Sequence, residues 1–267
     1  MIEHEKLSGG LFTITINEPS KLNSLTLSDF TRIAKLIQQA DADDEIIAVF
    51  LQSTGRFFSS GAQFDYFGEF EGMEPEKKEQ RLRSEIATMN VYVADVFAQH
   101  SKPLVCCLNG PAIGLAASLV LLCDIVYAMN DQVYLLFPFS SLGFAAELGC
   151  SVTAPLKLGI NRTNEHFVFS TKIQYKDMLQ ARLIAKDFHL RPGKTAEFNS
   201  QVHTLVQESL EGKNRHAMLN IQQLLSQKDA LVRAQGRETS VTLPFWLHGE
   251  PLKRFKQLQT RQRKHRL

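Results

Sequence analysis

The chain has 267 residues, of which 44% are hydrophobic and 22% are charged, and its formal net charge is +2 at pH 7. This composition is typical of a globular protein with one large domain, or with one domain and an appendage. The longest apolar runs, such as residues 115–123, are much shorter than a bilayer-spanning helix, and the acidic start Met1-Ile2-Glu3-His4-Glu5 does not resemble a secretory signal. We therefore expect neither membrane insertion nor secretion.

Strand and helix patterns alternate along the first part of the chain. Residues 11–17 alternate apolar and polar side chains, which predicts a strand with one exposed face. Thr26 and Asp29 form a capping-box pattern before a helix. That helix is indicated by apolar residues at helical spacing, namely Phe30, Ile33, Ala34 and Ile37. Apolar runs predict further strands at 46–53, 103–108, 124–129 and 133–137, followed by a helix at 149–158, where regular strands are expected to end. The alternation predicts an α/β core.

The last part of the chain has a helical pattern. Phe198, Val202, Val206 and Leu210 recur at a spacing of four, and the breakers Arg191-Pro192-Gly193 come just before them. We therefore expect a core at 1–194 and a helical C-terminal region at 195–267, of a kind that often packs against another subunit. The charged segment 68–85 is expected to be a surface loop or a short helix beside the site.

Cysteine and charge usage add two expectations. The four cysteines lie in apolar contexts without metal-ligand spacing, which predicts buried free thiols at Cys106, Cys107, Cys123 and Cys150. Residues 253–267 contain seven Lys or Arg and no acid, so the remainder has 23 bases against 28 acids, a balance of −5. Such a basic tail could meet nucleic acid, membrane phosphate, a phosphorylated cofactor or a targeting receptor, or it could be a solvated helix face.

Two turns rich in small residues carry the chemistry. Ser59-Ser60-Gly61-Ala62 and Gly110-Pro111-Ala112-Ile113-Gly114-Leu115 each follow a strand-like run. Small side chains let a substrate carbonyl approach the backbone closely, and two such turns can direct two free N–H groups at one developing oxyanion. Taken singly, each could equally be an ordinary strand-to-helix turn.

A single carboxylate strengthens the chemical interpretation. Glu147 stands in an otherwise uncharged stretch, residues 133–155. An unpaired carboxylate is costly to bury, and apolar surroundings raise its pKa, so that it becomes a proton acceptor suited to neutral pH. The alternative is a surface glutamate in a turn.

Longer blocks of the sequence resemble the crotonase superfamily, also called the enoyl-CoA hydratase/isomerase family, and within it the fungal peroxisomal Δ3,Δ2-enoyl-CoA isomerases. The resemblance covers nearly the whole chain. It is strongest at Thr54-Gly55-Arg56-Phe57-Phe58-Ser59-Ser60-Gly61-Ala62, at Cys107-Leu108-Asn109-Gly110-Pro111-Ala112-Ile113-Gly114, at Leu122-Cys123-Asp124-Ile125-Val126-Tyr127 and at Pro251-Leu252-Lys253-Arg254-Phe255.

The resemblance implies a fold and a set of binding residues. The fold would be a spiral of ββα turns with a helical C-terminal trimerisation region, in homotrimers or in homohexamers of stacked trimers. The oxyanion-hole N–H groups would belong to Ala62 and Leu115, while Ser60, Ala62 and Phe64 would surround the CoA adenine. Gln63 departs from the family, which commonly has Asp there, and we expect only a local structural effect.

The same resemblance favours isomerisation over hydration. The two glutamates that hydratases use are replaced here by Ser118 and by Pro138 or Phe139, whereas Glu147 matches the single glutamate of the fungal isomerases. The implied reaction needs no metal and no cofactor besides the acyl-CoA substrate. Asn90 is a possible site contact or a capping amide, and Phe137, Phe139 and Phe144 are candidates for the acyl pocket or simply for the core.

Other functions stay open at this point. Within enzymology they are a dienoyl-CoA isomerase, which usually needs further carboxylates, and a crotonase-fold thioesterase. Outside it they are an acyl-CoA sensor and a nucleic-acid binder, and the tail lacks the interleaved aromatics typical of the latter. The residues His265-Arg266-Leu267 resemble a peroxisomal address of the Ser-Lys-Leu type, which predicts an import receptor as partner and the peroxisomal matrix as location.

Overall fold

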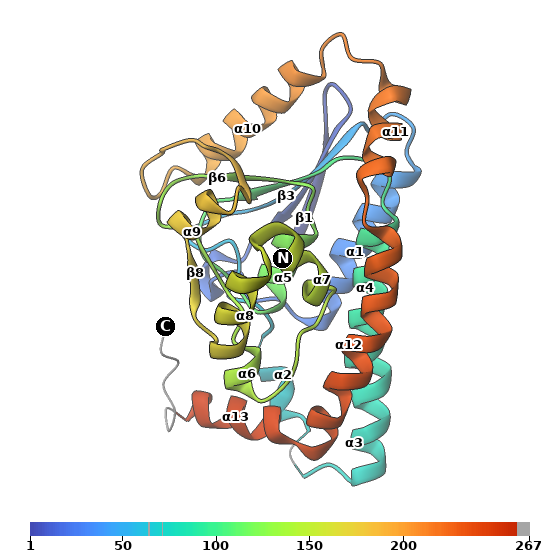
Figure 1. The fold of residues 1–267 in the computed structure, drawn as a ribbon, viewed down its shortest axis with the longest axis vertical. Helices are drawn as coiled ribbons and strands as arrows, with labels where there is room; N and C mark the ends of the chain where they lie inside the picture. Colours follow the sequence, from blue (N-terminus) through green and yellow to red (C-terminus); the bar gives the residue numbers. More distant parts are fainter. Residues whose placement is uncertain (64, 71, 261–267) are drawn as a thin grey trace.

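The computed structural model describes residues 1–63, 65–70 and 72–260 (Figure 1). The predictions for Phe64 and for His265-Arg266-Leu267 therefore lie outside the described residues. Among the residues that are described, no helix is both long enough and apolar enough to cross a bilayer.

The main sheet has six strands in the order β1-β2-β3-β4-β6-β9. β1 pairs antiparallel with β2, and all other neighbours in this sheet are parallel. The strands are β1 (Ile2–Leu7), β2 (Leu11–Ile16), β3 (Ala48–Ser53), β4 (Leu104–Leu108), β6 (Ile125–Ala128) and β9 (Ile184–Asp187). The strands predicted within 11–17, 46–53, 103–108 and 124–129 are confirmed.

A second sheet of three strands brings the second small-residue turn to the site. Its order is β5 (Ala112–Ile113), β7 (Tyr134–Leu136) and β8 (Lys172–Gln174). β5 is parallel to β7, and β8 is antiparallel to β7. The expectation that strands end near residue 158 is wrong, because β8 and β9 follow. Both strands are short. β8 buries only Ile173 and β9 buries only Ile184, so neither strand is marked by a run of apolar residues in the sequence.

Helices cover both faces of the main sheet. The helices before the C-terminal region are α1 (Leu27–Ala42), α2 (Asp65–Gly68), α3 (Pro75–Arg81), a π-helical turn (Leu82–Ala87), α4 (Thr88–Gln99), α5 (Leu115–Leu122), α6 (Phe139–Leu142), α7 (Cys150–Leu158), α8 (Ile160–Phe169) and α9 (Tyr175–Gln180), with a 3-10 turn at Pro19–Lys21. The predicted capping box of α1 is confirmed, since Asp29 N donates to Thr26 Oγ1 (3.1 Å) and Thr26 N donates to Asp29 Oδ2 (2.9 Å). The sequence predicts a surface loop or a short helix at 68–85; the segment is helical from Pro75, and α3 and the π-helical turn continue without a break into α4.

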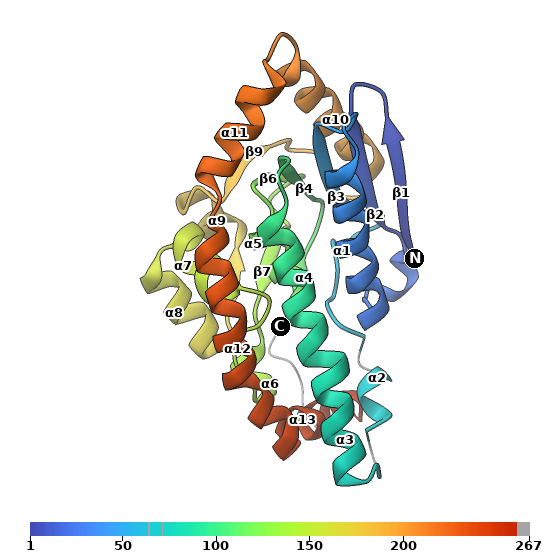
Figure 2. The same cartoon turned by 90° about the vertical axis from the view of Figure 1, so that its right-hand side faces the viewer.

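The C-terminal region consists of α10 (Thr195–Leu210), α11 (Arg215–Leu225), α12 (Lys228–His248) and α13 (Glu250–Gln259). α10 buries Phe198 and Val202 against Leu11 and Phe50. This contact corrects the expected exposed face of strand 11–17, because α10 covers that face. α12 runs beside α4, and α4 lies between α12 and α1 (Figures 1 and 2).

The four cysteines are free and buried, as predicted. Cys106 and Cys107 belong to different hydrophobic clusters, one on each face of β4. Successive side chains of a strand point to opposite faces, which explains the division. The expectation of buried thiols is confirmed.

Candidate active site

The two small-residue turns lie backbone to backbone. Ile113 N donates to Ser59 O (3.0 Å), and Ser59 N donates to Pro111 O (3.2 Å). A Cβ atom added at Gly61 would lie 2.5 Å from Ile113 O, and the φ of Gly61 is +90°. A Cβ at Gly110 would lie 2.2 Å from Arg56 O. Both glycines are therefore required for the close approach of the turns.

The first oxyanion-hole candidate, Ala62, forms an isolated parallel β-bridge with Leu25, and its N–H is directed away from Leu25. Leu25 N donates to Gly61 O (2.8 Å), and Gln63 N donates to Leu25 O (2.8 Å). Leu25 thus bonds to the groups on either side of Ala62, and in extended backbone the intervening N–H points to the opposite side. That side is a cavity lined by Ala62, Leu115 and Glu147 among others.

The second candidate, Leu115, is the first residue of α5, where backbone N–H groups have no intrahelical acceptor. Gly114 precedes it with φ +59° and ψ −129°, a conformation that L-residues rarely adopt. Its own N–H donates to Leu136 O (2.8 Å), which fixes the turn to β7. Within the described parts of the chain, neither the Ala62 N–H nor the Leu115 N–H donates to a protein acceptor. Two donors therefore face one cavity.

Two buried asparagines, which the sequence analysis did not single out, hold the loop before the first turn. Asn109 Nδ2 donates to Gly55 O (2.9 Å), and Asn109 Oδ1 accepts from Ser53 Oγ (2.8 Å). Asn23 Nδ2 donates to Thr54 O (2.7 Å) and to Phe57 O (2.8 Å). These side chains satisfy main-chain groups that the sheet leaves unpaired, which keeps the turn rigid.

Glu147 is buried, with 4% of its surface exposed, between α6 and α7. The alternative of a surface glutamate is therefore wrong. Burial raises its pKa from 4.5 to about 8. A hydrogen bond from Trp246 lowers this pKa, the negative charge of Glu238 raises it, and a hydrogen bond with the Asn90 side chain lowers it. A carboxylate of this kind can take a proton near neutral pH and return it.

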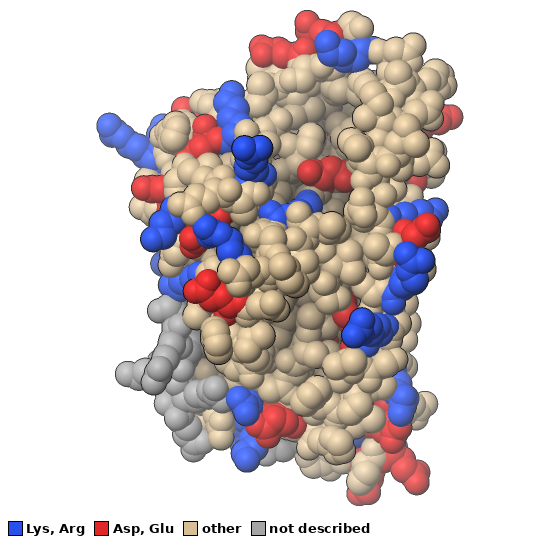
Figure 3. All heavy atoms as spheres, in the orientation of Figure 1, with Lys and Arg blue, Asp and Glu red and all other residues tan. Residues whose placement is uncertain are grey.

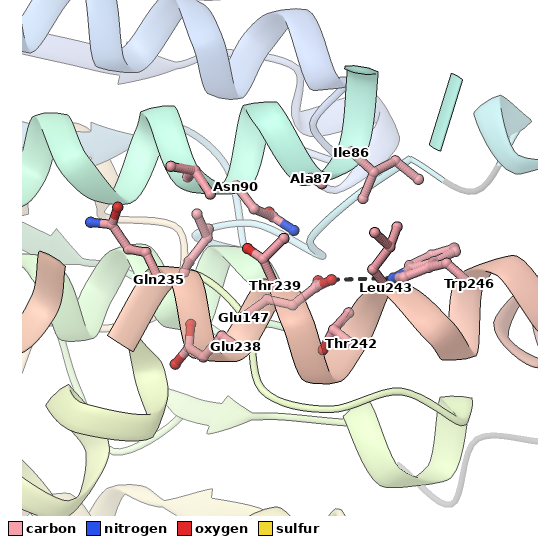
Figure 4. Close-up of a pocket in the computed structure, with 12 residues that line it drawn as sticks. Ile86, Ala87, Asn90, Glu147, Gln235, Glu238, Thr239, Thr242, Leu243 and Trp246 are labelled. Atoms are coloured by element: carbon pink, nitrogen blue, oxygen red, sulfur yellow. Dashed lines mark hydrogen bonds between the residues drawn. The ribbon is translucent and has the colours of Figure 1, made fainter. Parts of the chain in front are cut away.

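A second cavity extends from Glu147 between α4 and α12 (Figure 4). Asn90 from α4 points toward Glu147, while Glu238, Thr242 and Trp246 come from α12 (Figure 4). Trp246 Nε1 donates to Glu147 Oε1 (3.2 Å). The carboxylate and Trp246 line both cavities, so Glu147 lies where the two cavities meet.

The remaining predicted residues divide between the site and the core. Ser60, Phe139 and Phe144 line the cavity that contains the two N–H groups, together with Phe255 of α13. Phe137 does not line it. Its ring is fully buried and stacks on Phe167 with centroids 4.3 Å apart, so its assignment to the acyl pocket is corrected to the core.

The positions of the hydratase glutamates hold no acid in the structure. Ser118 on α5 is buried, and its Oγ donates to the main-chain oxygen of Glu147 (3.3 Å). Pro138 and Phe139 line the cavity as apolar side chains. Among the described residues that line this cavity, Glu147 is the only acid. The arrangement can bind a carbonyl oxygen and move a proton at a neighbouring carbon.

The described residues contain neither a cluster of metal ligands nor, on the face shown in Figure 3, a single basic patch. No group of three or more His, Cys, Asp or Glu side chains is placed to hold a metal ion among residues 1–63, 65–70 and 72–260. On the face shown in Figure 3, Lys and Arg are interspersed with Asp and Glu and do not form one basic patch. That face offers no broad surface for a polyanion.

Comparisons with known proteins find relatives that cover nearly the whole chain. The family model described as Enoyl-CoA hydratase/isomerase matches residues 6–242. The chain is similar to a Delta(3,5)-Delta(2,4)-dienoyl-CoA isomerase of Saccharomyces cerevisiae, with 47% identity over 98% of this chain and 97% of the relative. It is also similar to a 3,2-trans-enoyl-CoA isomerase of the same yeast, with 41% identity over 99% of this chain and 98% of the relative. A crystal structure of enoyl-CoA hydratase from Bacillus halodurans matches the fold with a TM-score of 0.83 and 21% identity, over 96% of this chain and 99% of that one.

Proposed function

The chain belongs to the enoyl-CoA hydratase/isomerase family, and from this premise we propose that it is an enoyl-CoA isomerase that converts 3-enoyl-CoA into trans-2-enoyl-CoA for fatty-acid β-oxidation. One observation carries the proposal. Glu147 is buried, and it is the only acid among the described residues that line the cavity with the Ala62 and Leu115 N–H groups. Moving a double bond within one molecule needs a single acid–base group, whereas hydration in this family uses two.

The proposed mechanism begins with the thioester oxygen on the N–H groups of Ala62 and Leu115. The Glu147 carboxylate removes a proton from C2, and the electrons of that C–H bond move toward the thioester to form a dienolate. The two N–H groups stabilise the negative oxygen. The protonated Glu147 then gives the proton to C4, which leaves a double bond between C2 and C3 and restores the carboxylate. No atom is gained or lost, so the reaction consumes neither metal nor redox cofactor.

A dienoyl-CoA isomerase is the second candidate, because the 47% identical relative carries that name. A second buried acid, Glu238, lies beside Glu147 in the cavity between α4 and α12. Both Glu238 oxygens already accept main-chain N–H bonds, from Gly149 (2.7 Å) and from Ser151 (2.8 Å). These bonds disfavour Glu238 as a proton shuttle, and we therefore place the single-shift reaction first.

The binding partners belong to the same proposal. The CoA adenine would contact the main chain around Ser60 and Ala62, and Phe64 as the third member of this set stays a prediction. Lys253 and Lys256 line a groove with Lys78, and these ammonium groups are suited to CoA phosphates. A homotrimer or homohexamer, and an import receptor that reads His265-Arg266-Leu267 in the peroxisomal pathway, are also predictions. Sedimentation and a fluorescent fusion lacking the last three residues would test them.

The decisive experiment compares wild type and Glu147→Gln on three substrates, namely 3-hexenoyl-CoA, a 3,5-dienoyl-CoA and crotonyl-CoA. We expect wild type to convert 3-hexenoyl-CoA and to leave crotonyl-CoA unhydrated. The turnover of Glu147→Gln on 3-hexenoyl-CoA should be about a hundredfold to ten-thousandfold lower than that of wild type. Product analysis would also detect free CoA, the sign of a thioesterase. Near wild-type turnover of Glu147→Gln would refute the mechanism, and faster conversion of the dienoyl-CoA would favour the second candidate.

A further inference from the structure

Side chains on one face of α12 form hydrogen bonds with the segment that carries Glu147. Glu238 accepts hydrogen bonds from Gly149 N (2.7 Å) and Ser151 N (2.8 Å), at the start of α7. One turn further along, Thr242 Oγ1 donates to Ala146 O (3.5 Å). Residues four apart lie on the same face of a helix, so these contacts form a row along α12.

The next turn of the row reaches the carboxylate itself. Trp246 Nε1 donates to Glu147 Oε1 (3.2 Å), as Figure 4 shows. The indole is 3% exposed and packs against the rings of Phe144 and Phe255, with centroids 5.3 and 5.9 Å away. A ring fixed on both sides presents its N–H in one direction, which restricts the Glu147 side chain to one orientation.

α12 is in turn attached to α4. With the Gln235 amide turned so that its nitrogen faces Val91 O and its oxygen faces Asp95 N, the orientation in which both atoms have partners, it donates to Val91 O (3.2 Å) and accepts from Asp95 N (3.0 Å). Asn90, whose side chain points toward Glu147 (Figure 4), lies on the same segment of α4. α12 therefore connects the segment that carries Glu147 to α4, the helix that carries Asn90.

We propose that Glu238 and Trp246 are positioning residues, which hold the main chain and the carboxylate of Glu147 and thereby set how readily it takes and returns a proton. The inference rests on the proposed function, since it gives Glu147 the role of base. Glu238 lines the cavity between α4 and α12 and does not line the one that contains the two N–H groups. Trp246 lines both cavities, and the role proposed for it is exerted through its hydrogen bond to Glu147.

The electrostatic environment makes the two residues act in opposite directions. Glu238 from α12 and the Cys150 thiol from α7 are the titratable groups that face Glu147 among the described residues, and Asn90 and Ser118 are neutral. The charge of Glu238 raises the pKa of Glu147, whereas the Trp246 hydrogen bond lowers it. Removing the charge of Glu238 should therefore lower the pKa of Glu147, and removing the Trp246 hydrogen bond should raise it.

The test measures kcat/KM against pH for wild type, Glu238→Gln and Trp246→Phe, with 3-hexenoyl-CoA as substrate. A base acts when ionised, so the rate should rise with pH through the pKa of Glu147. We expect this rise to move to lower pH in Glu238→Gln and to higher pH in Trp246→Phe. From a midpoint of about 8, a downward move of one pH unit would increase the rate at pH 7, relative to the plateau, about fivefold.

Two controls separate this role from general damage to the fold. Thr242→Val removes a hydroxyl from the same row without changing charge, and it should leave the midpoint where it is. Glu208→Gln removes a charge from the exposed side of α10 and should leave both midpoint and plateau unchanged. Should Glu238→Gln fold poorly, Trp246→Phe still tests the proposal, because its predicted shift has the opposite sign.

A measurement without substrate keeps this inference separate from the proposed function. The carboxylic C=O band of Glu147, identified by its absence in Glu147→Gln, can be titrated by infrared difference spectroscopy. We expect the midpoint of this titration to move to lower pH in Glu238→Gln and to higher pH in Trp246→Phe, as in the rate profile. Absence of isomerisation by wild type would refute the proposed function alone. Midpoints that coincide with wild type, or that move together, would overturn the roles of Glu238 and Trp246.

Discussion

Replacing Gly61 with alanine tests whether the contact between the two turns builds the oxyanion site. Gly61 has a φ of +90°, and an added Cβ would lie 2.5 Å from Ile113 O, which belongs to the opposite turn. The left-handed backbone should cost about 1–2 kcal/mol for a residue with a Cβ. Separating two closely packed backbones should cost about 1–3 kcal/mol more.

Gly193→Ala is the matched control. Gly193 has a φ of +87°, and a Cβ there would meet nothing within 4 Å. The control thus retains the backbone strain and omits the contact. We expect Gly193→Ala to lose about 1–2 kcal/mol in free energy of unfolding with unchanged turnover. Gly61→Ala should lose more stability, and its turnover should fall about a hundredfold to a thousandfold because the Ala62 N–H moves.

The assay combines denaturant unfolding with turnover on 3-hexenoyl-CoA, at one protein concentration because association alters apparent stability. The difference between the two variants isolates the effect of the contact with Ile113. Equal losses of stability together with wild-type turnover in Gly61→Ala would refute the reasoning, since the turns would then not need their close approach.

Three further predictions concern Glu147 and the loops that support the turns. Burial raises the pKa of Glu147 from 4.5 to about 8, so its contribution to stability is complete below pH 4.5 and is lost as the pH rises through about 8. At about 1.4 kcal/mol for each pH unit, unfolding free energy should fall by up to about 5 kcal/mol across this window, and Glu147→Gln should flatten the curve; parallel curves would contradict the assignment. Thr26→Ala removes the capping box of α1 and should lower the unfolding free energy by about 1 kcal/mol, while turnover, measured in the same samples, stays unchanged. Asn109→Ala removes one hydrogen bond each from Gly55 O and Ser53 Oγ, which keep their bonds to Thr195 Oγ1 and Phe57 O, and should cost about 1–2 kcal/mol; a loss of turnover that Thr26→Ala lacks would show that Asn109 supports the site.

The features that the sequence predicted well are local ones. The capping box of α1 depends on residues three positions apart, and the strands within 46–53 and 103–108 depend on short apolar runs. The burial and raised pKa of Glu147, expected from its apolar neighbours in the chain, are both found. Each of these predictions uses information contained in one short segment.

The features that the sequence did not predict depend on distant contacts. Glu238 and Trp246 meet the Glu147 segment from 89 and 99 residues away, and no local pattern distinguishes them from other helical residues. The polar face of strand 11–17 is buried because α10 covers it, which no periodicity within the strand can show. Phe137 and Phe139 stand on either side of Pro138 in one apolar segment, and only the fold sends one ring to the core and the other to the cavity.

The row of contacts from α12 has a consequence during biosynthesis. A growing polypeptide that has emerged only through α10 already contains both small-residue turns, Asn90 and Glu147, but it lacks the hydrogen bonds that Glu238 and Trp246 make to the Glu147 segment. If Glu238 and Trp246 position Glu147 as proposed, full activity is expected only after α12 has been translated and has docked against α4 and α7.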